Sequence, residues 1–218
     1  MKTLGQDDYL ALRAGAVVLE ADAFGDKVLR LADGTILKFF RRKRLFSSAA
    51  WYPYAQRFAD NAAALGQRGI PVPEVISVVR IPCIKRDAVH YQPLAGRTLR
   101  EMRREGLDSK AEQALKEAFT QFVISLHECG VYFRSLHLGN VVYTPDHCFG
   151  LIDISDARIH PRRLGQRLRH RNLAHLLRIA SESDWVDSAQ VLGAWRGLGP
   201  GKAYGKARHS LPVAGGDD

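Results

Sequence analysis

The sequence predicts an α+β protein, with a small antiparallel sheet of five strands in its first part and a mostly helical second part. Two observations predict this fold class. Before residue 95, short apolar runs are broken by turns that contain glycine and aspartate, as expected for antiparallel strands. After residue 97, apolar residues recur every three or four positions, as expected for helices that bury one face.

Length and composition are those of a globular protein. A chain of 218 residues, 46% of them hydrophobic, can bury a core in one large domain or two small lobes. No uncharged apolar run is long enough to cross a bilayer, and the acidic start does not fit a secretory signal. Cys83, Cys129 and Cys148 are widely spaced and odd in number, which indicates reduced thiols rather than a disulfide frame or a zinc site. We therefore expect a cytoplasmic protein.

The charge balance predicts an anionic partner. Lys and Arg total 32 against 23 acidic residues, and Arg is the more frequent base. Guanidinium groups suit phosphates and carboxylates because their donors form a planar fork. A phosphorylated glycolipid, a membrane surface and a nucleic acid all fit this charge. A nucleic-acid-binding module is the least favoured, because the chain has no recognisable binding motif and no interleaved aromatic residues.

Residues 16–40 predict three strands, because turns around Gly25 and Gly34 divide an otherwise apolar stretch. Lys38 lies in the third of these strands, on a face that is otherwise apolar. Two interpretations are open: a lysine that projects from an apolar face for a function, or an edge-strand or snorkelling lysine.

One helix is predicted between the strands of the first part. It covers residues 48–67, with Ser47 or Ser48 as its cap and Gly69 after its end. The basic run 41–44 before it either binds phosphates or forms a solvated face at a strand-to-helix junction.

Two more strands, over residues 75–84 and 88–94, complete the predicted sheet. The sequence QPLAG breaks the strand pattern and predicts a linker between two lobes. The expected divisions are a first lobe over 1–92, a second lobe over 93–198 and a disordered tail over 199–218.

The second part contains a candidate phosphoryl-transfer site. A helix over 109–129, capped by Ser109, leads into a stretch in which Asn140 and Asp153 flank two short apolar runs. Two strands joined by the turn at Pro145 would return both side chains to one end of a hairpin. An amide oxygen and a carboxylate are hard ligands that Mg²⁺ takes when phosphate oxygens complete its shell.

The order of these elements, together with the segment HLGNVVYTPDHCFGLIDISDARI, resembles the protein-kinase-like fold. More narrowly, it resembles the small bacterial lipopolysaccharide-core kinases, which phosphorylate heptose or Kdo sugars, and the related toluene-tolerance proteins. The resemblance covers residues 17–179. It implies two lobes that bind ATP and Mg²⁺ between them.

The resemblance assigns roles to three residues in particular. Lys38 matches the strand lysine that holds the α- and β-phosphates of ATP. Asn140 matches the metal-binding Asn of the catalytic loop, and Asp153 matches the metal-binding Asp of the D-F-G motif, written DIS here. The glycine-rich loop is reduced to Gly25, and Asp60 is the nearest carboxylate that could pair with Lys38.

The catalytic loop departs from the family pattern at the residue that acts as the general base. Aligned on Asn140, Ser135 occupies the place of the catalytic Asp, and a serine cannot accept a proton as a carboxylate does. His137 and Asp156 are the available substitutes, although each also fits the role of a loop or cap residue.

Two functions follow from this pattern. The leading hypothesis is an ATP- and Mg²⁺-dependent phosphotransferase that phosphorylates a sugar hydroxyl of the lipopolysaccharide core, in peripheral contact with the inner membrane. Ser135 and His137 would lie where the acceptor hydroxyl enters, and the arginines after Asp153 would either meet the glycolipid or form a solvated face. The alternative is a pseudokinase that regulates envelope stress or solvent tolerance, which Ser135 and the thin glycine loop favour.

Overall fold

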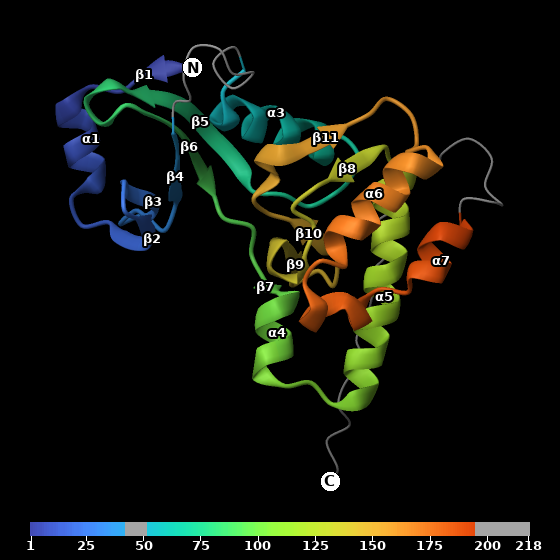
Figure 1. Ribbon diagram of the computed structural model, residues 1–218. Helices are drawn as coiled ribbons and strands as arrows, with labels where there is room; N and C mark the ends of the chain where they lie inside the picture. The colour runs from blue at the N-terminus through green and yellow to red at the C-terminus, as the bar shows by residue number, and fades with distance from the viewer. Residues whose placement is uncertain (42–51, 195–218) are drawn as a thin grey trace, which may run out of the picture. The chain divides into compact units, whose positions relative to one another are not determined.

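The computed structural model describes residues 1–41 and 52–194 (Figure 1). The basic residues 42–44, the predicted caps Ser47 and Ser48, and the tail 199–218 lie outside the described residues. The chain divides into two compact units. The first comprises Met1–Ala63 and Pro73–Leu94, and the second comprises Ala64–Val72 and Ala95–Asp218.

The first unit contains a mixed six-stranded sheet with the order β1-β5-β6-β4-β3-β2. Five of its strands lie where the sequence predicts them. The sixth, β1, has two residues and pairs in parallel with β5, so the prediction of five purely antiparallel strands is wrong at this edge. So short a strand has no alternating pattern that could predict it. The strands are β1 (Lys2–Thr3), β2 (Val17–Asp22), β3 (Gly25–Arg30), β4 (Ile36–Arg41), β5 (Glu74–Ile81) and β6 (Arg86–Gln92).

The two faces of this sheet pack against different helices. Leu37 and Phe39 of β4 point into a buried cluster with Tyr9 of α1 (Gln6–Arg13), a helix that the sequence analysis did not predict. Lys38 lies between them in sequence and therefore faces the other way. On that face, the ring of Phe40 stacks at 6.3 Å on Tyr54 of α3 (Tyr54–Gly66).

Helix α3 begins later than the predicted residue 48. Residues 52 and 53 are not helical, and the helix starts at Tyr54, directly after Pro53. The proline ring disfavours helical backbone in the residue before it, which explains the later start.

The second unit is mostly helical, with short strand pairs between its helices. Its longest helix, α5, packs against β8 and α7 (Figure 1). The cap of α5 is Asp108 rather than the predicted Ser109, because the Asp108 carboxylate accepts hydrogen bonds from the N–H groups of Lys110 and Ala111. The helices are α4 (Leu99–Glu105), α5 (Ser109–Glu128), α6 (Gln166–Leu176) and α7 (Ser188–Gly193).

Short strands and 3₁₀ turns of the second unit surround the candidate site. Strand β9 pairs with β10 on one side and β7 on the other, and β8 pairs with β11. The strands are β7 (Arg97–Thr98), β8 (Val131–Phe133), β9 (Val141–Tyr143), β10 (Phe149–Leu151) and β11 (Ala157–Ile159). The turns are η2 (Leu138–Asn140), η3 (Ile154–Asp156) and η4 (Ala180–Trp185); a further turn, η1 (Pro82–Ile84), lies in the first unit.

No helix in the described part of the chain combines the length and apolar character that a membrane span needs.

Gly130 joins α5 to β8 and is enclosed by backbone. Its φ is +76°, and an added Cβ would lie 2.4 Å from the carbonyl oxygen of His160 and 2.5 Å from that of Arg162. Gly15 has the same φ of +76° but nothing within 4 Å of an added Cβ. The two glycines therefore separate the effect of left-handed backbone from the effect of crowding.

We expect Gly130→Ala to destabilise the protein far more than Gly15→Ala. Left-handed backbone costs an alanine about 1 kcal/mol at either position, while the backbone overlap at residue 130 adds about 2 kcal/mol or more. Urea unfolding followed by circular dichroism measures both losses. Equal losses for the two variants would contradict the close approach at Gly130.

Candidate functional site

The predicted hairpin is confirmed, and it returns Asn140 and Asp153 to the same end. Strands β9 and β10 are antiparallel with Val141 opposite Leu151. The N–H of Ile152 donates to the carbonyl of Asn140 at 3.0 Å and extends this pairing beyond the strands. Asn140 and Asp153 therefore flank the open end of the hairpin.

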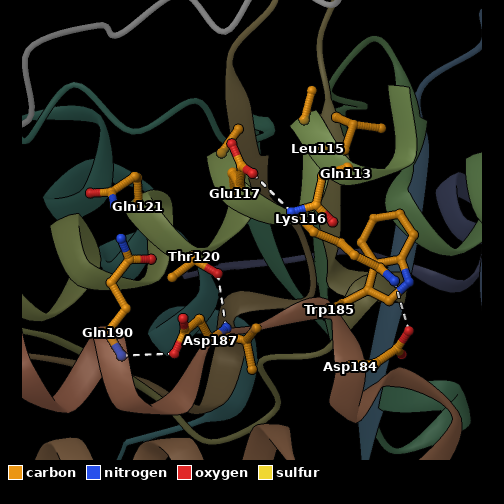
Figure 2. A pocket seen from close by; sticks show the side chains of 13 residues that line it. Gln113, Leu115, Lys116, Glu117, Thr120, Gln121, Asp184, Trp185, Asp187 and Gln190 are labelled. Carbon is orange, nitrogen blue, oxygen red and sulfur yellow. Dashed lines mark hydrogen bonds and ion pairs between the residues drawn. The ribbon is translucent and has the colours of Figure 1, made fainter. Parts of the chain in front are cut away.

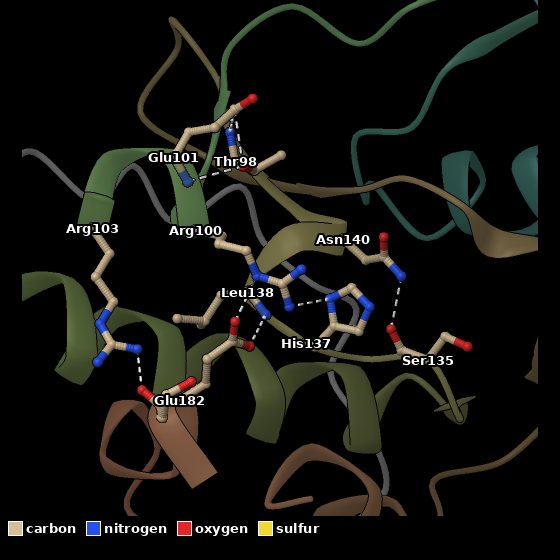
Figure 3. Close-up of polar contacts among 10 residues, drawn as sticks. Thr98, Arg100, Glu101, Arg103, Ser135, His137, Leu138, Asn140 and Glu182 are labelled. Atoms are coloured by element: carbon tan, nitrogen blue, oxygen red, sulfur yellow. Dashed lines mark hydrogen bonds and ion pairs between the residues drawn. The ribbon is translucent and has the colours of Figure 1, made fainter. Parts of the chain in front are cut away.

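The side chain of Asn140 is fixed by its own loop (Figure 3). Its Nδ2 donates to the carbonyl of Ser135 at 2.9 Å, and the residue is 8% exposed. With the nitrogen committed in this way, the amide oxygen is the group left to act as an acceptor.

Asp153 has an uncommon backbone conformation. Its φ of 52° and ψ of 41° lie in the left-handed region, which aspartate tolerates better than most residues. Such conformations are concentrated at functional sites. Asp153 is half-buried.

The donor set at this end of the hairpin fits a magnesium ion. An amide oxygen from Asn140 and a carboxylate from Asp153 are hard oxygen ligands of the kind that Mg²⁺ accepts. Among the described residues, no cluster of three or more His, Cys, Asp or Glu side chains could hold a metal by itself. Two protein ligands would leave the rest of an octahedral Mg²⁺ shell to water or to oxygens of a bound ligand.

Ser135 and His137 occupy the loop before Asn140. The Ser135 hydroxyl donates to Oδ2 of Asp156 at 2.6 Å. His137 is half-buried, and its Nδ1 lies 3.3 Å from Nη2 of Arg100. Because a guanidinium can only donate, Nδ1 accepts and the proton of the neutral ring lies on Nε2.

Burial lowers the pKa of His137, and the nearby Arg100 cation lowers it further, against opposing contributions from Glu182 and Asp153. His137 is therefore neutral at pH 7 and supplies a hydrogen-bond donor rather than a positive charge.

A buried carboxylate from η4 supports the loop. Glu182 is 4% exposed, accepts from Nε of Arg100 at 2.6 Å, and accepts from the N–H of Leu138 at 3.0 Å (Figure 3). Gly139 is next to Leu138, and an added Cβ there would lie 2.7 Å from Nη1 of Arg100. The Arg100 guanidinium therefore lies directly against the loop that precedes Asn140.

A second clamp holds the start of the same loop. Asn172 of α6 donates from Nδ2 to the carbonyl of Phe133 at 2.6 Å, and its Oδ1 accepts from the Phe133 N–H at 3.4 Å. His127 Nε2 donates to the same oxygen at 3.2 Å. Asn172, Phe133 and His127 are all buried, so the clamp is shielded from water.

Arg100, Glu182 and Asn172 are not among the site residues predicted from the sequence. Each is far from residues 133–140 in the chain, so no local spacing connects it with the loop. Only the packing of α4, η4 and α6 brings these side chains to the site.

The other predicted site residues belong to the first unit. Lys38 lies on the inner strand β4, opposite Val28 and Val89, so its interpretation as an edge-strand lysine is wrong. Gly25 is at the tip of the β2–β3 hairpin, with φ of +108°.

The Asp60 carboxylate forms hydrogen bonds with residues close to it in the chain. Its carboxylate accepts from the Tyr52 hydroxyl at 2.5 Å and from Gln56 Nε2 at 2.9 Å. Burial and this carboxylate raise the pKa of Tyr52 to about 12.

A hollow of about 800 Å³ lies between α5 and the segment of η4 and α7 (Figure 2). Lys116 at its wall forms ion pairs with Glu112 at 2.8 Å and Asp184 at 2.7 Å. None of the predicted site residues lines it, so it contributes nothing to the candidate site.

Comparison with known proteins adds no assignment. No protein-family model matches this chain, and no curated protein is significantly similar to it in sequence.

Glu182→Gln is expected to destabilise the protein by about 1–3 kcal/mol, because it removes the charge that pairs with Arg100 in a buried position. The matched control is Glu105→Gln, which removes a carboxylate from an ion pair with Arg97 that is more than half exposed. That exposed pair should contribute at most about 1 kcal/mol. Denaturant unfolding measures both variants, and equal losses would contradict a supporting role for Glu182.

The stability of the protein should fall as pH is lowered from 6.5 toward 4. Burial, with the Arg169 cation, lowers the pKa of His127 to about 4. In this window the unfolded chain binds the proton that the folded His127 does not, so acid favours unfolding. Between pH 7 and pH 5, this residue should reduce the free energy of unfolding by about 2 kcal/mol.

Two variants test that prediction by urea unfolding at both pH values. His127→Gln keeps a donor for Asn172 but cannot titrate, so it should lose less stability than wild type between pH 7 and pH 5. His170→Gln removes an exposed histidine of α6 and should keep the wild-type pH dependence. Identical pH dependence in wild type and His127→Gln would contradict the prediction.

Proposed function

We propose that this chain is a kinase-like phosphotransferase. It binds ATP and Mg²⁺ and transfers the γ-phosphoryl group to a sugar hydroxyl of the lipopolysaccharide core. The observation that most supports this proposal is that Asn140 and Asp153 both lie at the open end of the β9–β10 hairpin. The side-chain amide of Asn140 is fixed there by its hydrogen bond to the Ser135 carbonyl.

Each residue has a separate task in this proposal. Asn140 and Asp153 would hold Mg²⁺, which neutralises charge on the phosphates during transfer. Lys38 and the turn at Gly25, both in the first unit, are the residues of that unit that we propose to contact the nucleotide phosphates. Asp60 is not included, because its carboxylate already accepts from Tyr52 and Gln56.

The proposed acceptor is anionic, and exposed arginines support this choice. Arg158, Arg162 and Arg167 are exposed after the metal-binding end of the hairpin. Arg169 belongs to the same basic segment but is fully buried, donates to the carbonyl of Leu164 and pairs with Glu128, so it has a structural role. The exposed arginines would meet phosphates of the glycolipid at the inner membrane surface.

The alternative proposal is a pseudokinase that regulates envelope stress or solvent tolerance. Ser135 favours it, because the loop has no carboxylate at the position of the kinase base. Nucleotide binding without turnover would support this alternative.

Asp153→Asn should lower phosphate transfer by at least about 100-fold and should abolish the Mg²⁺-dependent stabilisation by ATP. Asparagine also tolerates left-handed backbone, so the fold should survive. Radioactive transfer from γ-labelled ATP to a deacylated core oligosaccharide measures the first effect. Thermal unfolding with ATP and Mg²⁺ measures the second, where ligand at 100 times its Kd adds about 2.7 kcal/mol.

Asp146→Asn is the matched control for this experiment. It removes a carboxylate from the exposed turn of the same hairpin, and both readouts should remain at the wild-type level. An unshifted wild-type melting temperature at saturating ATP and Mg²⁺ would refute both the phosphotransferase and a nucleotide-binding pseudokinase.

A further inference from the structure

Asp156 lies beside the hydroxyl that replaces the kinase base. Its Oδ2 accepts from Ser135 Oγ at 2.6 Å and from Arg134 Nε at 3.3 Å. Its Oδ1 is buried and has no hydrogen-bond partner among the described residues. The side chain as a whole is 15% exposed, so this carboxylate is largely removed from water.

Strand pairing fixes this arrangement. Strand β11 begins directly after Asp156 and pairs with β8, with Ala157 opposite Phe133. Asp156 precedes one member of that pair, and Arg134 and Ser135 follow the other. Because the strands are antiparallel, these residues meet at one end of the ladder.

The Ser135 hydroxyl connects the Asp156 carboxylate to the loop before Asn140. Oδ1 is sealed from solvent, and Oδ2 is already occupied by Ser135 and Arg134. Ser135 itself is partly exposed and follows Arg134 on the loop that leads to Asn140. An acceptor hydroxyl that contacts Ser135 Oγ is therefore linked to Asp156 by the hydrogen bond between the two side chains.

We propose that Ser135 and Asp156 form a proton relay that replaces the missing catalytic carboxylate, an inference that rests on the proposed phosphotransfer. The acceptor hydroxyl gives its proton to Ser135 Oγ while the Ser135 proton passes to Oδ2 of Asp156. The acceptor oxygen forms a bond to the γ-phosphorus, and the bond from that phosphorus to the ADP oxygen breaks, with its electron pair leaving on ADP. Asp156 then returns its proton to solvent through Ser135.

Ser135 is the residue that contacts the acceptor, and Asp156 acts through it. A general base of this kind typically contributes about 10²- to 10⁴-fold. Asp156→Asn and Ser135→Ala should therefore each slow phosphate transfer to the core oligosaccharide by about 10²-fold or more. The double variant should be no slower than the slower single variant, because the two groups act as one unit.

Nucleotide binding separates this inference from the proposed function. Asp156→Asn should keep the wild-type thermal shift with ATP and Mg²⁺, whereas Asp153→Asn should lose it. Wild-type activity in Asp156→Asn would overturn the relay and leave the phosphotransferase intact. Absence of transfer in wild type would instead overturn the phosphotransferase, and the relay with it.

A measurement without turnover tests the coupling between the two residues. In Ser135→Cys, the introduced thiol should be alkylated by iodoacetamide with a midpoint above the usual thiol pKa of about 8.5, because the Asp156 carboxylate disfavours a neighbouring thiolate. Adding Asp156→Asn should lower that midpoint by about one pH unit. Peptide mass spectrometry distinguishes this thiol from the exposed Cys83.

The other charged or titratable groups that face Asp156 are retained in both variants. They are Arg134, on the same loop as Ser135, and His175 of α6, whose pKa Asp156 raises against the larger lowering effect of burial. If the alkylation midpoint of Ser135→Cys is unchanged after Asp156→Asn, Asp156 does not act on residue 135, and the relay is overturned. Intact mass after incubation with ATP supplies a last check, since a stable phosphate on Ser135 would make it the acceptor and refute the relay.

Discussion

A short antiparallel pairing is the constraint on which the candidate site depends. Strands β9 and β10 contribute three residues each, and the hydrogen bond from Ile152 to Asn140 extends the ladder to its open end. Because antiparallel strands return the chain to its starting point, a pair of residues thirteen apart meets at one place. Asn140 and Asp153 then need no further long-range contact to lie at the same end of the hairpin.

Long-range contacts instead fix the loop before that hairpin. Glu182 binds the Leu138 N–H and Arg100, and Asn172 binds both backbone groups of Phe133. Unsatisfied backbone groups are costly when buried, so a loop held by such clamps has few alternative conformations. Glu182 belongs to η4 and Asn172 to α6, so two separate elements hold the loop in place.

The charge next to Ser135 comes from a neighbouring element and not from the loop that carries the serine. The carboxylate is not on the loop itself but on η3, where Asp156 lies behind the Ser135 hydroxyl. His137 is held neutral by burial and by Arg100. The loop therefore presents the hydrogen-bonding groups of Ser135 and His137. The negative charge of Asp156 lies behind the Ser135 hydroxyl.

Much of the fold was predictable, because it depends on local pattern. Glycine turns and alternating apolar residues predicted five strands, and apolar periodicity predicted α5, both of which the structure bears out. The hairpin with Asn140 and Asp153 was also predictable, since turn chemistry and two short apolar runs suffice to define it. Strand β1 and helix α1 were missed, because two residues and one buried tyrosine give too weak a pattern.

The sequence by itself determined the residue types at the loop, including the serine where kinases have a carboxylate. Only the tertiary structure decided what surrounds that serine. The pairing of β11 with β8 brings Asp156 to Ser135, and the packing of η4 brings Glu182 to Leu138 across 44 residues. Such contacts depend on which side chains satisfy each other once buried, and no spacing along the chain encodes that choice.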